Sequence, residues 1–258
     1  MSNTALITGA SSGIGRELAL IHASKGGDVI ITARRRAELD ALKKEIEDQK
    51  SVKVHVIALD LSASDGAEKL YHAVKELGLQ VDILINNAGF GGRGLHIERD
   101  LQGEMTMIDL NVKALVSLTH LFANDMVAQG GGKILNVGST AGFIPGPLQG
   151  VYFATKAFVN SYSQAIDQEL RDKGVTCTVL APGYVETEFA KVADLEGTLL
   201  ENSRGAKAKD VARIGYNSMR GRELFVINDG VLSFVMNWIV PLVPRRMMLK
   251  MVHRSQKK

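Results

Sequence analysis

The chain has 258 residues, a formal charge of +3, 45% apolar residues and a single cysteine, Cys177. This length and apolar content suit one large α/β domain, and the small charge argues against a nucleic-acid-binding protein. One cysteine excludes an intramolecular disulfide framework, and no set of metal ligands surrounds it, so we expect no metal site. The first residues lack the pattern of a secretory signal peptide, and we therefore expect a cytoplasmic protein.

Short apolar runs typical of β-strands alternate along the chain with longer helical patterns. Parallel strands joined by helical crossovers are buried on both faces, which makes each strand an almost continuous apolar run. The pattern predicts one Rossmann-like, doubly wound parallel sheet with helices on both faces. The predicted strands are residues 5–7, 29–32, 54–58, 83–85, 133–137, 176–180 and 224–227.

A glycine-rich turn follows the first predicted strand and opens a helical pattern. The N-terminus of a helix presents free backbone N–H groups and the positive end of the helix dipole, and both favour a phosphate group. The turn alone is a weak signal, because glycines also close tight connections that bind nothing. Its candidate pyrophosphate-binding residues are Thr8, Gly9, Ser11, Ser12, Gly13, Ile14 and Gly15.

Three arginines and no acidic residue follow the second predicted strand, at positions 34–36. An acidic residue there would bind the ribose 2′-hydroxyl of NAD, whereas arginine accommodates the 2′-phosphate of NADP. The alternative is a solvated basic helix start, but cations at a helix N-terminus oppose the dipole by about 0.3–1 kcal/mol each. The sequence therefore predicts NADP, with Arg34 as the principal 2′-phosphate ligand and Arg35 beside it.

Tyr152 and Lys156 are four residues apart, so on a helix they share one face. A phenol with a pKa of about 10 is a poor base, but a neighbouring ammonium group and a positive nicotinamide would favour the phenolate. Taken alone, the spacing also fits an amphipathic helix with a buried ring and a solvent-reaching lysine. Ser139 could likewise be only a turn former, and Asn111 a polar residue on a helix surface.

Together these segments resemble the short-chain dehydrogenase/reductase family over nearly the whole chain to about Phe225. The resemblance implies that Tyr152 exchanges a proton with the substrate oxygen, which Ser139 hydrogen-bonds, while a nicotinamide carries the hydride. It also implies that Lys156 holds the nicotinamide ribose and that Asn111 positions a water. The motifs that carry it are residues 8–15, Asp60, residues 86–89, Asn111, residues 138–139, residues 152–156 and residues 182–183.

The same resemblance assigns further residues to the cofactor and implies a homo-oligomer. Asp60 and Leu61 would border the adenine, and Thr187 would contact the carboxamide side. The remaining residues implied to line the cofactor are Asn87, Ala88, Gly89, Tyr152, Lys156, Pro182 and Gly183.

Residues 183–204 form the longest irregular stretch near the predicted site, and we expect a substrate lid rather than a variable surface insertion. Apolar side chains near this edge are candidates for the substrate pocket, although such residues also complete cores. The predicted function is an NADP(H)-dependent oxidoreductase that interconverts a carbonyl and a secondary alcohol on a partly apolar small molecule. The alternative is a catalytically silent dinucleotide-binding protein. The candidate substrate residues are Phe143, Ile144, Leu148, Tyr184 and Phe189.

We expect a catalytic domain over residues 1–230 and a C-terminal extension over residues 231–258 that is first apolar and then basic. The apolar run, residues 231–243, is shorter than the roughly 20 residues that span a bilayer and contains Pro241. Six Lys or Arg and no acid follow from Arg245 onward. Two interpretations remain open: a peripheral contact with an anionic membrane, or a final helix packed over the substrate pocket or a subunit interface.

Overall fold

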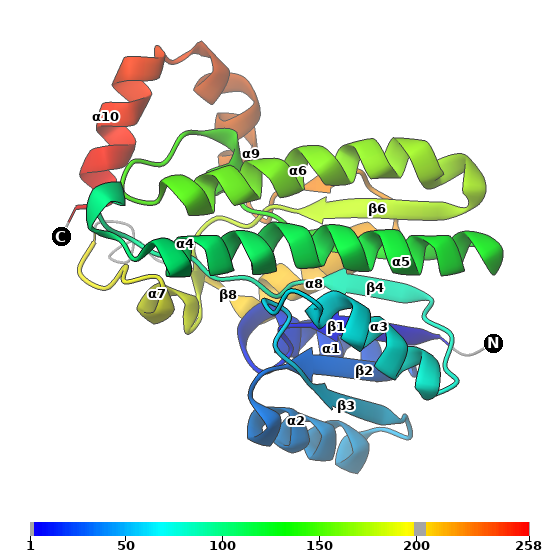
Figure 1. The fold of residues 1–258 in the computed structure, drawn as a ribbon. Coiled ribbons are helices and arrows are strands. Elements are labelled where there is room, and N and C mark those ends of the chain that lie inside the picture. Colours follow the sequence, from blue (N-terminus) through cyan, green and yellow to red (C-terminus); the bar gives the residue numbers. More distant parts are fainter. Residues whose placement is uncertain (1–2, 199–204, 258) are drawn as a thin grey trace.

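The computed structural model describes residues 3–198 and 205–257, which form a parallel sheet covered by helices on both faces (Figure 1). Within these residues the sheet has seven strands in the order β3-β2-β1-β4-β5-β6-β9, so the order reverses beside β1. This confirms the predicted doubly wound fold. The strands are β1 (Thr4–Thr8), β2 (Asp28–Ala33), β3 (Val54–Ala58), β4 (Ile83–Asn86), β5 (Gly132–Val137), β6 (Val175–Leu180) and β9 (Phe225–Val226).

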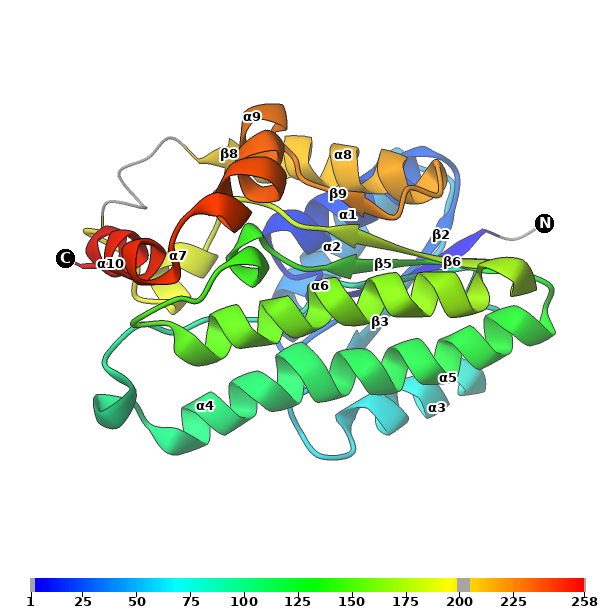
Figure 2. The ribbon, with the colours of Figure 1, turned by 90° about the horizontal axis from the view of Figure 1, so that it is seen from above.

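Side chains alternate between the two faces of the sheet and build two separate cores. Ile83 and Ile85 of β4 join the core beneath α1 (Gly13–Ser24), α2 (Arg36–Gln49) and α8 (Ala208–Arg220). Leu84, between them, points to the opposite core. That core lies under α3 (Gly66–Glu76), α5 (Leu115–Ala128) and α6 (Gly150–Leu170), and Figure 2 shows α5 and α6 side by side.

The carboxyl ends of the strands carry most of the irregular structure. α4 (Leu101–Ile108) leads into α5 through a π-helical turn at Asp109–Ala114. Further short elements are 3₁₀ turns at His96–Glu98, Thr140–Phe143 and Arg171–Lys173, the small parallel pair β7 (Val185–Glu186) and β8 (Ala206–Lys207), and α7 (Phe189–Val192). The predicted lid thus contains β7 and α7, and its residues 199–204 lie outside the described residues.

After β9 the chain forms a C-terminal segment, residues 230–257, beyond the carboxyl end of the sheet (Figures 1 and 2). It comprises α9 (Gly230–Phe234), a π-helical turn at Val235–Ile239, a 3₁₀ turn at Val240–Leu242 and α10 (Arg245–Ser255). Among the helices of the described residues, none is long and apolar enough to cross a membrane.

Candidate active site

A cleft of about 970 Å³ lies at the carboxyl ends of the strands and collects most of the predicted site residues. Its wall includes the turns that follow β1, β2, β4, β5 and β6, together with parts of α6, α9 and α10. The predicted residues that line it are Gly9, Ser11, Ser12, Gly13, Ile14, Arg34, Arg35, Asp60, Leu61, Asn87, Ala88, Gly89, Ser139, Ile144, Tyr152, Lys156, Pro182, Gly183, Tyr184, Thr187 and Phe189.

Two predicted cofactor residues, Thr8 and Gly15, shape the glycine-rich turn from behind the cleft surface. The Thr8 hydroxyl accepts hydrogen bonds from the backbone N–H groups of Asn87 and Ala88, each at 3.0 Å. A Cβ at Gly15 would lie 2.4 Å from the carbonyl oxygen of Gly9, so a larger residue would displace the turn. These residues therefore fix the backbone that lines the cleft.

Two predicted substrate residues, Phe143 and Leu148, do not line the cleft. Phe143 packs edge-on against Phe225, with ring centroids 5.5 Å apart, in a small apolar cluster beside β6. Leu148 has a positive φ of 69°, and its carbonyl oxygen accepts a hydrogen bond from the N–H of Gly94 at 2.9 Å. The expectation that they face substrate is thus corrected: Phe143 completes a core, and the Leu148 backbone ties two loops together.

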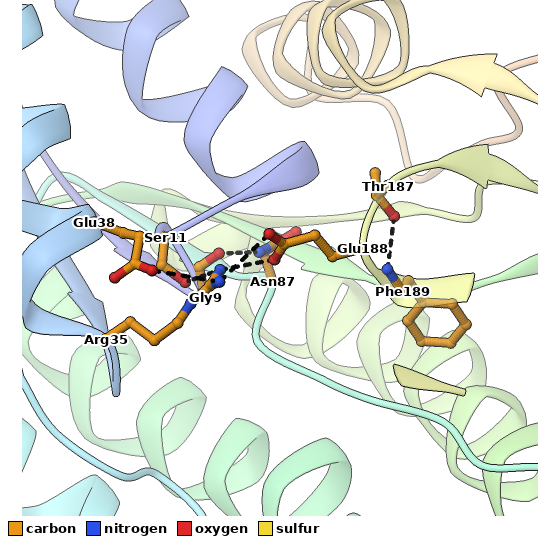
Figure 3. Close-up of polar contacts among 8 residues, drawn as sticks. All are labelled: Gly9, Ser11, Arg35, Glu38, Asn87, Thr187, Glu188 and Phe189. Carbon is orange, nitrogen blue, oxygen red and sulfur yellow. Dashed lines mark hydrogen bonds and ion pairs between the residues drawn. The ribbon is translucent and has the colours of Figure 1, made fainter. Parts of the chain in front are cut away.

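The start of α1 forms a cradle suited to a phosphate. Gly9 and Gly13 have φ values of 66° and 55°, which favour glycine, and a Cβ at Gly9 would lie 2.8 Å from Cα of Ala88. The Asn87 side chain donates to the carbonyl oxygens of Thr8 and Gly9 at 3.0 and 3.2 Å; the bond to Gly9 is drawn in Figure 3. The N-cap, Ser12, makes no side-chain capping bond, so the first N–H groups of α1 keep their hydrogen-bonding capacity.

The arginines after β2 have different surroundings. Arg35 donates to Glu188 Oε2 at 2.8 Å and to Ser11 Oγ at 3.2 Å, so it reaches across the turn (Figure 3). The hydrogen bond with Glu188 raises the pKa of Arg35. Arg34 is exposed and lines the cleft. Burial alone would raise the pKa of Asp60, but hydrogen bonds from Ser62 and the charge of Arg34 outweigh it and lower that pKa.

Tyr152 and Lys156 lie one turn apart on α6, with Lys156 Nζ 5.9 Å from the centroid of the Tyr152 ring. Lys156 Nζ also donates to the carbonyl oxygen of Val137 at 2.8 Å. Burial raises the pKa of Tyr152 to about 12, only partly offset by a hydrogen bond with Ser139, and lowers the pKa of Lys156 to about 8. Burial is therefore the main influence on the pKa of both side chains in this structure.

Ser139 and Asn111 are both buried but make different contacts. Ser139 lies two residues after β5, at the start of the 3₁₀ turn Thr140–Phe143, and its Oγ accepts a hydrogen bond from the N–H of Ala141 at 3.1 Å. Asn111 lies in the π-helical turn, a local irregularity frequent at functional sites. Its side chain bonds both backbone groups of Phe90, at 3.1 and 2.9 Å, and the Thr155 hydroxyl at 3.1 Å. Its side chain thus holds the loop after β4 against α6.

The structure adds cleft residues that the motifs did not indicate. Glu188, the partner of Arg35, borders the glycine-rich turn. Gln149 and Gln256 line the opposite part of the cleft, where Gln149 Nε2 donates to Gln256 Oε1 at 2.6 Å. Gln256 follows α10, so the C-terminal segment does cover the cleft, as one of the two open interpretations expected. The four-residue spacing of Met248 and Val252, both buried, is the sequence signal that could have indicated this packing.

Known proteins match both the sequence and the fold. A model of the short chain dehydrogenase family matches residues 3–196. Sulfoacetaldehyde reductase from Chromohalobacter salexigens is 41% identical over 194 residues, which are 74% of this chain and 76% of that protein. The short-chain dehydrogenase from Sphingobium yanoikuyae in complex with NADPH aligns with a TM-score of 0.85 and 30% identity over 93% of both chains. A short chain dehydrogenase/reductase from Burkholderia phymatum in complex with NAD aligns with a TM-score of 0.81 and 25% identity, over 91% of this chain and 92% of that one.

Proposed function

The chain belongs to the short chain dehydrogenase family of oxidoreductases acting on alcohol and carbonyl groups, and we propose that it is an NADP(H)-dependent member with Tyr152 as general acid and base. One observation carries this proposal: Ser139, Tyr152 and Lys156 line the same cleft as the phosphate cradle at the start of α1. A protein that only binds a dinucleotide needs no such group of proton-transferring side chains. We therefore favour the enzyme over a silent binding protein.

The residues present fit a nicotinamide cofactor of the NADP type. When bound, it supplies the hydride. The backbone N–H groups at Ser12 and Gly13, at the start of α1, would hold its pyrophosphate, and Arg34, which lines the cleft beside the end of β2, would hold the 2′-phosphate. The relatives include an NADPH complex and an NAD complex, so the choice rests on this chain's own arginines. The residues that we propose to line the remaining parts of the cofactor are Asp60, Leu61, Asn87, Ala88, Gly89, Pro182, Gly183 and Thr187.

In reduction, Ser139 and Tyr152 would donate hydrogen bonds to the substrate carbonyl oxygen and polarise it. As negative charge develops there, the Tyr152 phenol transfers its proton to that oxygen. With a pKa of about 12, this phenol is protonated at neutral pH and ready to act as an acid. The Lys156 ammonium, charged below a pKa of about 8, would stabilise the phenolate left behind and hold the cofactor ribose. These protonation states suit reduction at neutral pH.

The substrate part of the cleft has a mixed lining. Ile144, Phe189 and Met236 supply apolar surface, and the Gln149–Gln256 amide pair supplies polar groups. A pocket of this kind suits a partly apolar carbonyl compound with a polar substituent. We therefore propose a small-molecule substrate of this kind. We propose no nucleic-acid partner and a location in the cytoplasm.

We also propose that the chain forms a homo-oligomer through α6. Phe158, 41% exposed, stacks on Tyr162 one turn later, with ring centroids 5.5 Å apart and planes 15° from parallel. An exposed phenylalanine stacked on a half-buried tyrosine of a long helix suits an interface between copies. Light scattering should give a multiple of the chain mass for the wild type and a lower mass for Phe158→Glu. An unchanged mass in that variant would place the interface elsewhere.

The enzymatic proposal is tested by following oxidation of NADPH and of NADH with a panel of aldehydes and ketones. We expect turnover of at least one partly apolar member, with a higher kcat/KM for NADPH. Binding of NADPH without turnover of any panel member would favour the silent dinucleotide-binding protein. Equal dissociation constants for the two cofactors would contradict the NADP assignment.

A further inference from the structure

The C-terminal segment has an apolar face on each side. Leu232 and Met236, four residues apart, line the cleft with its inner face. Val231, Phe234 and Trp238 recur at a spacing of three and four residues on the outer face, where they are 75%, 58% and 68% exposed. A helix that is apolar all round is normally buried on all sides. The outer face therefore lacks the cover that the inner face has.

Exposed apolar side chains are concentrated in this segment. Fifteen large apolar side chains are exposed in the described residues, and seven of them lie between Val231 and Met251. Leu242, in the turn between α9 and α10, is 80% exposed. In Figure 1 this part of the chain projects from the sheet and its helices. An exposed apolar patch of this kind marks a protein or membrane contact.

The charge of the same segment selects between these partners. From Gly230 to Lys258 the sequence has six Lys or Arg and no Asp or Glu, while the rest of the chain has a net charge of −3. Arg245 and Arg246 begin α10, directly after the exposed turn, and both are exposed. A second copy of this segment would bring like charges together, whereas a surface of anionic phospholipid head groups complements them.

The segment is also held in a fixed position on the catalytic domain. Met248 and Val252 of α10 are buried against Phe153, the neighbour of Tyr152. Arg93 Nη1 donates to the carbonyl oxygen of Gln256 at 3.3 Å, and Gln149 bonds the Gln256 side chain. The outer face is therefore presented as part of the folded domain and not by a loose tail.

We propose that the outer face of the C-terminal segment docks on a membrane surface containing anionic phospholipids. Trp238 and Leu242 enter the boundary between head groups and acyl chains. The amphipathic Trp ring and the apolar Leu side chain are both typical of segments bound at membrane surfaces. Arg245 and Arg246 contact the lipid phosphates. The segment lies on the membrane without crossing it, and its inner face still lines the cleft, so an apolar carbonyl compound dissolved in the bilayer has a short route to Tyr152.

Cosedimentation of the full chain with vesicles tests the proposal. We expect binding to vesicles of phosphatidylcholine mixed with phosphatidylserine, weaker binding to phosphatidylcholine alone, and loss of binding as salt is raised. Trp238→Ser with Leu242→Ser should abolish it. Arg245→Glu with Arg246→Glu should weaken it at least about tenfold, since each cation near an anionic surface contributes a factor of about five.

Matched controls separate this surface from general effects. Leu77→Ser removes an exposed apolar side chain at the end of α3, outside the segment, and Lys25→Glu with Lys44→Glu makes the same charge change on another surface. Circular dichroism verifies that each variant is folded. The proposal is overturned if the wild type fails to bind anionic vesicles, or if control and segment variants bind alike. It is also overturned if the Trp238 and Leu242 changes only lower the oligomer mass and leave vesicle binding intact.

Discussion

The two ends of the cleft are built in different ways. At the cofactor end, neighbouring loops are fixed through backbone groups: the Thr8 hydroxyl accepts from two N–H groups, and Asn87 donates to two carbonyl oxygens. At the substrate end, two segments meet through their side-chain amides, in the bond between Gln149 and Gln256. Contacts to backbone groups require particular residues at particular spacings. Contacts between two side chains can be made by many different residue pairs.

This comparison predicts that changes at the cofactor and catalytic end act on rate or cofactor affinity, and that changes at the substrate end act on substrate preference. The largest expected effect follows from Ser139→Ala. Loss of one hydrogen-bond donor to a developing oxyanion should lower kcat about 100-fold or more. Steady-state kinetics measure kcat, and fluorescence titration should give an unchanged NADPH affinity.

Thr140→Ala is the matched control, because it removes the neighbouring hydroxyl, which donates to the carbonyl oxygen of Pro182 at 3.3 Å. This variant should retain most activity. Equal losses in the two variants would show that the turn, and not the Ser139 hydroxyl, is what matters.

The next effect concerns stability. Burial lowers the pKa of Lys156 from its usual 10.5 to about 8, so below pH 8 the folded protein holds an unfavourable ammonium group. Lys156→Met should raise the free energy of unfolding at pH 7 by about 1–3 kcal/mol, allowing for the lost bond to Val137. Urea denaturation at a series of pH values measures this change.

The sign of the pH dependence is fixed by the same pKa. Between pH 8 and 10.5 the folded wild type releases a proton that the unfolded chain keeps, so wild-type stability from this group rises with pH. The difference in free energy of unfolding between Lys156→Met and the wild type should therefore decrease between pH 8 and 10.5. Lys133→Met changes a less buried lysine outside the cleft, and it should raise the free energy of unfolding at pH 7 by a smaller amount. A lower free energy of unfolding for Lys156→Met than for the wild type at pH 7 would contradict this explanation.

Arg34→Ala tests whether Arg34, at the cofactor end of the cleft, binds the 2′-phosphate. Loss of a charge-assisted hydrogen bond to the 2′-phosphate should weaken NADPH binding about tenfold or more and leave NADH binding nearly unchanged. Arg36→Ala is the control, because Arg36 is exposed, pairs with Asp40 at 2.8 Å and does not line the cleft. Isothermal titration should separate the two variants, and equal effects on NADPH and NADH would remove Arg34 from the phosphate site.

The smallest effect is expected at the substrate end. Ile144→Ala removes apolar surface from the cleft and should raise KM for apolar ketones about threefold to tenfold with little change in kcat, since each methylene contributes about 0.8 kcal/mol when fully buried. Phe143→Leu, one residue earlier but outside the cleft, should leave KM unchanged. A larger KM change in Phe143→Leu than in Ile144→Ala would contradict the cleft lining described above.

The same contrast explains what the sequence could predict. The sheet and its strands follow from apolar runs that must be buried on two faces, and Gly9 and Gly13 are required by backbone angles. Phe143 and Leu148 could not be placed, because an apolar residue beside an active site serves a core or a pocket equally well. The burial that raises the pKa of Tyr152 could not be predicted from its four-residue spacing to Lys156, because Phe189, from a distant segment, packs against the ring.

The central claim is that Tyr152 transfers the proton at a site organised by the cofactor end of the cleft. Single-turnover oxidation of bound NADPH by a carbonyl substrate tests it directly, with the wild type and Tyr152→Phe compared after equal loading with NADPH. The account predicts that the variant binds NADPH with nearly wild-type affinity but oxidises it at least about 100-fold more slowly, the scale of positioned acid catalysis. Oxidation at the wild-type rate in Tyr152→Phe would contradict it.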